Sequence, residues 1–144
     1  MKLLSVKELQ ARIAEAESAK ASAALKHQQA EEEEKRALLE RLSKPSGLSD
    51  DEVMEKASII INRAVENGQM SVQVFRFPHS LCSDDGRAIN QAEAGWEKTL
   101  TGIPKEIYDF WKRQLQPRGY HIRYETLNYP GGMPGDIGII LSWG

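Results

Sequence analysis

The sequence is poor in cysteine, with Cys82 as the single one among 144 residues. One cysteine excludes a disulfide within the chain and a multi-cysteine zinc or iron–sulfur site. No apolar run approaches the roughly 20 residues that span a membrane, and the charged start, MKLLSVKELQ, resembles neither a signal peptide nor an anchor. With 19 Lys and Arg against 21 Asp and Glu, the net charge is −2, so no overall basic field would attract nucleic acid. We therefore expect a cytoplasmic protein without membrane contact and without a metal or cofactor.

Residues 1–44 lack glycine, proline and aromatic side chains altogether. Eight alanines fall between Ala11 and Ala30, and EEEEKR follows them, so strong helix formers run without a breaker. One helix of about 40 residues would be roughly 60 Å long, too long to be covered by a small domain. We predict that residues 1–44 form a separate helical segment that either stays solvated or packs against a partner helix.

The same segment carries an incomplete heptad pattern. Steps of three and four residues begin with Val6, Leu9 and Ile13 and then reach alanines that alternate with polar residues. A second register, which begins at Leu4, is no more complete. A solvated helix and a helix in coiled-coil association both remain open. The run of small residues favours association, because a solvated helix has no need of it.

Residues 45–144 show the patterns of a compact domain. A capping box at Ser49 and Glu52 predicts the start of a helix, and Asn67-Gly68 predicts its end. Pro104 suits the first turn of a second long helix, which Pro117 and Gly119 would end. Alternation and flanking turns predict the other elements, which are strands at 71–77, 120–126 and 137–143 and a short helix around 86–92.

These elements predict an α+β fold for residues 45–144. We expect a two-layer domain with about three strands, mostly antiparallel, and two main helices on one face of the sheet. The last two strands should pair as an antiparallel hairpin, with residues 72–77 beside one of them. The mostly polar stretch from His79 to Gly102 is expected to be largely loop.

That polar stretch contains the residue types of a cysteine-dependent enzyme. A cysteine nucleophile needs an imidazole and a carboxylate nearby. Cys82 with His79 or His121, and with Asp84 or Asp136, would supply them. His79, Cys82 and Asp84 could also ligate zinc, but they offer three ligands where a structural site needs four. The competing interpretation is structural, with Cys82 packed against the sheet and Asp84 capping a short helix.

Two further features could bind a partner. The loop 130–136 matches no phosphate-binding signature, yet Gly131, Gly132 and Asp136 lie in a stiff connection that could form a recognition surface. The second feature is a basic cluster near aromatic residues, a combination found in nucleic-acid-binding surfaces. Its members are Lys112, Arg113, Arg118 and Arg123.

Two observations weaken the basic cluster. Residues 45–144 hold ten basic and thirteen acidic side chains. Alternation also places Tyr120 and Tyr124 on the face opposite His121 and Arg123, so rings and charges are separated.

The sequence therefore predicts a non-enzymatic interaction or regulatory protein. It would self-associate as an oligomer, or bind a partner protein, through the helix at 1–44 and present the α+β domain at 45–144. Two alternatives stay open, a nucleic-acid-binding protein that uses the basic cluster and an enzyme that uses Cys82.

Overall fold

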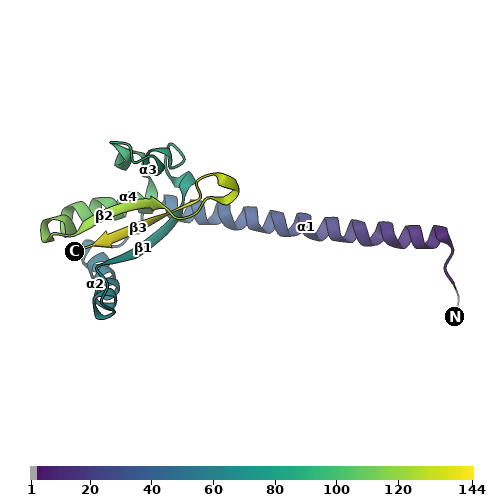
Figure 1. The fold of residues 1–144 in the computed structure, drawn as a ribbon, viewed down its shortest axis with the longest axis horizontal. Coiled ribbons are helices and arrows are strands. Elements are labelled where there is room, and N and C mark those ends of the chain that lie inside the picture. The colour runs from purple at the N-terminus through teal and green to yellow at the C-terminus, as the bar shows by residue number, and fades with distance from the viewer. Residues whose placement is uncertain (1–2) are drawn as a thin grey trace. The chain divides into compact units, whose positions relative to one another are not determined.

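The computed structural model describes residues 3–144 and confirms the predicted α+β fold (Figure 1). The chain divides into two compact units, the first ending at Leu38 and the second running from Leu39 to Gly144. The helices and strands are α1 (Val6–Ser43), α2 (Asp50–Glu66), β1 (Ser71–Pro78), α3 (Arg87–Asn90), α4 (Gly102–Phe110), β2 (His121–Thr126) and β3 (Asp136–Ser142).

Helix α1 is unbroken over 38 residues, as its composition predicted. Its start is fixed by a capping box, in which the Glu8 N–H donates to Ser5 Oγ (3.2 Å) and the Ser5 N–H donates to the Glu8 carboxylate (3.4 Å). None of its side chains is buried. Across residues 3–144, no helix has the length and apolar character to cross a membrane.

The sheet has three antiparallel strands in the order β1-β3-β2 (Figure 1). The predicted hairpin is present, with Ile122 opposite Leu141 and Tyr124 opposite Ile139. Strand β1 pairs with the other edge of β3, and its register shifts between Gln73 and Phe75. The extra residue, Val74, forms a bulge that keeps hydrophobic side chains of β1 over the core.

The core lies on one face of this sheet. Ile137, Ile139 and Leu141 alternate along β3 toward that face and are all buried. The opposite face carries exposed polar side chains, including Arg76 and Arg123. The domain is therefore a two-layer structure, in which the main core lies on one sheet face and Ile140 of β3 is buried on the other.

Two helices cover the buried face. Helix α2 begins where the sequence predicted, because the Glu52 N–H donates to Ser49 Oγ (3.2 Å). Helix α4 is followed by one π-helical turn, Trp111–Leu115, and by a 3-10 turn that ends at Gly119. The Tyr124 hydroxyl on β2 donates to the carbonyl of Pro104 (2.7 Å), which ties the sheet to the first turn of α4.

The segment from His79 to Gly102 is more ordered and more buried than its polar composition suggested. It contains α3 and two 3-10 turns, His79–Leu81 and Trp96–Thr99. It also contributes apolar side chains to the main core cluster, namely Leu81, Cys82, Ile89 and Leu100. The segment thus covers one end of the core.

The last turn of α1 belongs to the second compact unit. Leu39 and Leu42 are half-buried against the core cluster. Gly102, at the start of α4, lies so close to this turn that a Cβ there would come within 2.8 Å of Ser43 Cα. The boundary between the units therefore falls inside α1, six residues before the predicted one at Lys44.

Candidate functional site

Cys82 lies in the core and is 3% exposed. Burial raises the pKa of its thiol from 9.0 to about 11, although a hydrogen bond with Thr99 opposes this shift. A cysteine nucleophile needs the opposite shift, because the thiolate is the reactive form. The environment of Cys82 therefore favours its structural interpretation.

The residues predicted to act with Cys82 have other contacts. Asp84 accepts hydrogen bonds from the backbone N–H groups of Gly86 (3.0 Å) and Ala88 (2.9 Å), so it caps the start of α3. The ring Nδ1 of His79 lies 3.1 Å from the carbonyl oxygen of Asp85. These contacts hold the loop in place, and they engage Asp84 and His79 with backbone groups rather than with each other.

His121 is far from this loop. It lies at the start of β2, opposite Ser142, whereas the His79–Asp84 loop follows the end of β1, where Pro78 pairs with Asp136. These are opposite ends of the sheet. In the part of the chain that the structure describes, no three His, Cys, Asp or Glu side chains are grouped as metal ligands would be.

The loop 130–136 and the segment from His79 to Gly102 lie at the same end of the sheet. The Tyr129 hydroxyl donates to Asn90 Oδ1 (2.8 Å), which links the two directly. Asp136 forms an ion pair with Arg76 (2.8 Å), and Gly131 and Gly132 are exposed in the left-handed region. The neighbouring polar groups thus bond to one another at the surface.

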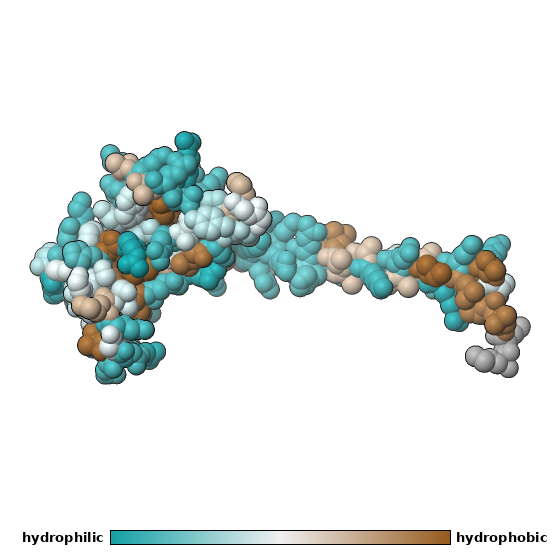
Figure 2. Space-filling view, viewed as in Figure 1, coloured by the Kyte–Doolittle hydropathy of each residue, from teal (hydrophilic) through white to brown (hydrophobic). Residues whose placement is uncertain are grey.

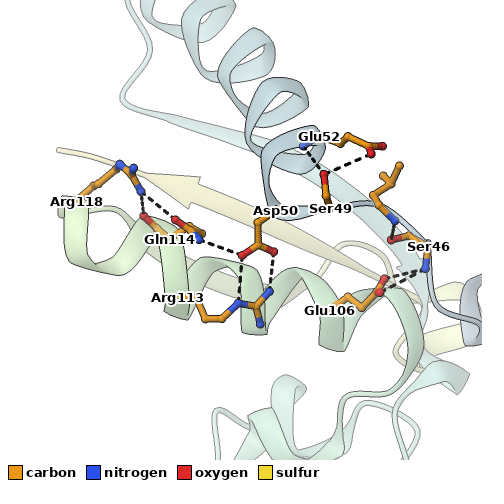
Figure 3. Close-up of polar contacts among 9 residues, drawn as sticks. Ser46, Ser49, Asp50, Glu52, Glu106, Arg113, Gln114 and Arg118 are labelled. Atoms are coloured by element: carbon orange, nitrogen blue, oxygen red, sulfur yellow. Dashed lines mark hydrogen bonds and ion pairs between the residues drawn. The ribbon is translucent and has the colours of Figure 1, made fainter.

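Three of the four cations in the predicted basic cluster have acceptors. Arg113 forms an ion pair with Asp50 (2.9 Å), and Gln114 donates to the same carboxylate (3.0 Å), as Figure 3 shows. Arg118 donates to the backbone carbonyl of Gln114, and Arg123 pairs with Glu125 (3.3 Å). Lys112 is exposed. Two of the four cations, Arg113 and Arg123, are therefore paired with carboxylates, and the bond from Arg113 lowers the pKa of Asp50.

Tyr124, one of the aromatic residues near these cations in the sequence, is not accessible for stacking. Tyr124 is buried, and its ring lies 5.0 Å from that of Trp96 and 6.4 Å from that of Tyr108. Arg123 points to the other, exposed face of the sheet. The structure thus separates Tyr124 from Arg123, as the alternation predicted.

The sequence did not reveal a groove between α2 and α4. It encloses about 530 Å³, and its floor includes Val74 and Phe75 of β1. Apolar side chains from both helices line it, among them Ala57 on α2 and Ile107 on α4. The short side chain of Ala57 between the larger Val53 and Ile60 is the sequence signal that could have indicated this space. A groove of this volume and character is typical of a binding site.

The second apolar feature is the N-terminal part of α1. Val6, Leu9 and Ile13 are 70%, 47% and 59% exposed. Figure 2 shows hydrophobic residues gathered toward this end of the helix. Contiguous exposed apolar side chains of this kind mark interaction surfaces.

Comparisons of the chain with known protein families, with curated proteins and with solved structures gave no match.

Proposed function

We propose that this chain is a non-enzymatic interaction protein that self-associates through α1 and presents the α+β domain. One observation carries the proposal. Helix α1 has no buried side chain over its 38 residues, yet its first turns expose Val6, Leu9 and Ile13. These three side chains share one face of the helix, because they follow one another at three and four residues.

A helix of this kind gains stability from a partner. Most helical stability in proteins comes from packing an amphipathic face rather than from intrinsic propensity. Burying one Val, Leu or Ile side chain contributes about 1.5–3 kcal/mol. Burial of these three side chains would therefore contribute favourably to the free energy of association. A helix that stays solvated gains no such contribution.

The two alternatives have weaker support. An enzyme with Cys82 as nucleophile would need a thiolate where burial favours the thiol. A nucleic-acid-binding surface would need free cations, and Arg113 and Arg123 are engaged with carboxylates.

The proposal is tested by size-exclusion chromatography with light scattering on the full chain. We expect the wild type to have a mass that is a multiple of 16.2 kDa and to dissociate on dilution. Ile13→Glu should weaken association, because it places a charge in the apolar face while keeping a good helix former. Ala11→Glu is the matched control, since it lies about 200° around the helix from Ile13. A wild-type monomer at tens of micromolar would overturn the proposal.

A further inference from the structure

We infer that the apolar face of α1 docks into the α2–α4 groove of a second copy of this chain. The inference rests on the proposed self-association and identifies the surface to which α1 binds. In the following, the α1 stripe means Val6, Leu9 and Ile13, and the groove means the space between α2 and α4 described above.

At one end of the groove, the start of α2 is bonded to the π-helical turn that follows α4. There Asp50 at the start of α2 bonds to Arg113 and Gln114 (Figure 3). Among the residues that line the groove, Ala57 on α2 has a short side chain that fills little of the space, and Ile107 contributes from α4. Apolar surface of the sheet is left accessible below them.

The α1 stripe has the spacing that such a groove accepts. Helices that bind in hydrophobic grooves use side chains at positions i, i+3 and i+7, and Val6, Leu9 and Ile13 have this spacing. The three positions extend about 10.5 Å along the helix axis. One short helical face can therefore present all three side chains to the groove.

The groove must belong to a second copy. Ser46 and Leu48, which line it, follow the end of α1 by only a few residues. Ser46 is thus at most about 11 Å of chain from Ser43. Leu9 precedes Ser43 by 34 residues of unbroken helix, which corresponds to about 50 Å. The stripe of one chain cannot fold back to its own groove without breaking α1.

Charges on both surfaces select one orientation of the docked helix. Arg12 and Glu17 flank the α1 stripe on opposite sides, because they are displaced in opposite directions around the helix from Ile13. At the groove, α4 carries Glu106 and Asp109, whereas α2 carries Lys56. Arg12 over α4 and Glu17 over α2 would match charges on both sides, and the reverse orientation would oppose them.

These rim charges are available for a partner. Among the ion pairs within residues 3–144, none includes Lys56 or Asp109. Asp50 is already engaged by Arg113, so it does not add to the free charge of the groove. Glu106 accepts a backbone N–H from Ser46 (3.1 Å) and forms no ion pair within residues 3–144.

Each copy offers one stripe and one groove, so reciprocal docking closes a two-fold dimer. In that dimer, the stripe of each copy lies at the groove of the other copy, and about 50 Å of helix separates that groove from the other copy's own stripe. A parallel pair of α1 helices would instead bring the two stripes together and leave both grooves empty. The two arrangements differ in a measurable distance.

The first experiment fills the groove. Ala57→Leu adds apolar volume inside the groove at a helical position, and Ser58→Leu adds the same volume on the exposed neighbouring position. Sedimentation equilibrium on the full chain should show at least about tenfold weaker association for Ala57→Leu, the loss of about 1.4 kcal/mol. The melting temperature of Ala57→Leu should not fall, and Ser58→Leu should associate like the wild type.

The second experiment exchanges charges. Lys56→Glu and Glu17→Lys should each weaken association by about two- to fivefold, the range of exposed ion pairs. The double variant should recover most of the wild-type affinity. Lys105→Glu, on α4 but outside the groove, is the control and should have no effect.

The third experiment measures orientation with spin labels on Ala11→Cys. Cys82 is buried and stays unlabelled under native conditions, which the wild type verifies. Reciprocal docking predicts a label separation of about 40–50 Å, whereas a parallel helix pair predicts about 20–25 Å.

The outcomes separate the two proposals. A monomeric wild type would overturn the proposed function and this inference together. A wild-type dimer with labels about 20–25 Å apart, or with unchanged affinity in Ala57→Leu and Lys56→Glu, would overturn this inference alone.

Discussion

At the residue scale, Cys82 shows how burial decides between chemistry and structure. The sequence places Cys82 near two histidines and several carboxylates, which is the inventory of a cysteine enzyme. The fold gives the thiol an apolar environment instead, and this raises its pKa to about 11. A thiol of this kind acts as a small hydrophobic side chain.

We predict that iodoacetamide modifies Cys82 slowly in the native protein. At a given pH between 6 and 8, a pKa about two units higher leaves about a hundredfold less thiolate, and burial slows access further. Mass spectrometry should therefore show rapid labelling only after unfolding in urea. Rapid labelling of the native protein at pH 6 would contradict this account and support the enzyme alternative.

The raised pKa of Cys82 also predicts that the free energy of unfolding falls at alkaline pH. Above about pH 9 the thiol ionises in the unfolded chain but stays protonated in the folded one. Ionisation therefore stabilises the unfolded state, and folding stability from this group falls between about pH 9 and 11.

Asp50 is the second residue whose environment shifts its pKa measurably. Its pKa lies below 3.8, first because of the hydrogen bond from Arg113 and second because of that from Gln114. We predict that Arg113→Gln raises the pKa of Asp50 toward 3.8, as NMR titration of its carboxyl carbon would show. Since the folded-state pKa is lowered, this contribution to stability is present above about pH 4 and is lost as the pH falls through the folded value. An unchanged pKa in Arg113→Gln would contradict the role given to this pair.

At the element scale, the sequence predicted helices and strands well because their patterns are local. The capping box at Ser49 and the alternation at 137–143 each depend on neighbouring residues alone, and both predicted elements are present. The hairpin between β2 and β3 also followed from their order in the chain.

Features that depend on distant contacts were not predictable in this way. Four core side chains lie in the polar segment 79–102. The sequence did not indicate them, because Leu81, Ile89 and their neighbours follow no single hydrophobic period. The groove is equally invisible, since it depends on the separation of α2 from α4. The ion pair between Arg113 of the predicted basic cluster and Asp50 was not predictable for the same reason, since the two residues lie 63 positions apart in the chain.

Gly102 offers a test of the contact between α4 and the last turn of α1. Its φ is +60°, and a Cβ there would strike the Leu42 carbonyl and Ser43 Cα. Gly102→Ala should therefore destabilise the protein by about 2–4 kcal/mol, from backbone strain and forced displacement together. Gly47→Ala is the matched control, because its φ is +74° but no atom lies within 4 Å of the added Cβ. Equal effects of the two variants in urea unfolding would contradict close packing at Gly102.

At the scale of the whole molecule, the division of the chain has a measurable consequence. The sequence predicted a domain at 45–144, and its independent folding stays a prediction. The contacts of Leu39 and Leu42 place part of α1 against the core. A chain of residues 39–144 should therefore be more stable than one of 45–144 by about 2 kcal/mol, the value of two half-buried leucines. Equal free energies of unfolding in urea would show that this turn contributes nothing.

The central claim is that α1 makes the molecule self-associate, and sedimentation equilibrium tests it most directly. The full chain and residues 39–144 would be compared over a range of concentrations up to tens of micromolar, where association of moderate affinity is populated. The account predicts a concentration-dependent mass above 16.2 kDa for the full chain and a monomer for residues 39–144, which lack the α1 stripe. A full chain that stays at 16.2 kDa throughout, or a shortened chain that associates as strongly as the full one, would contradict it.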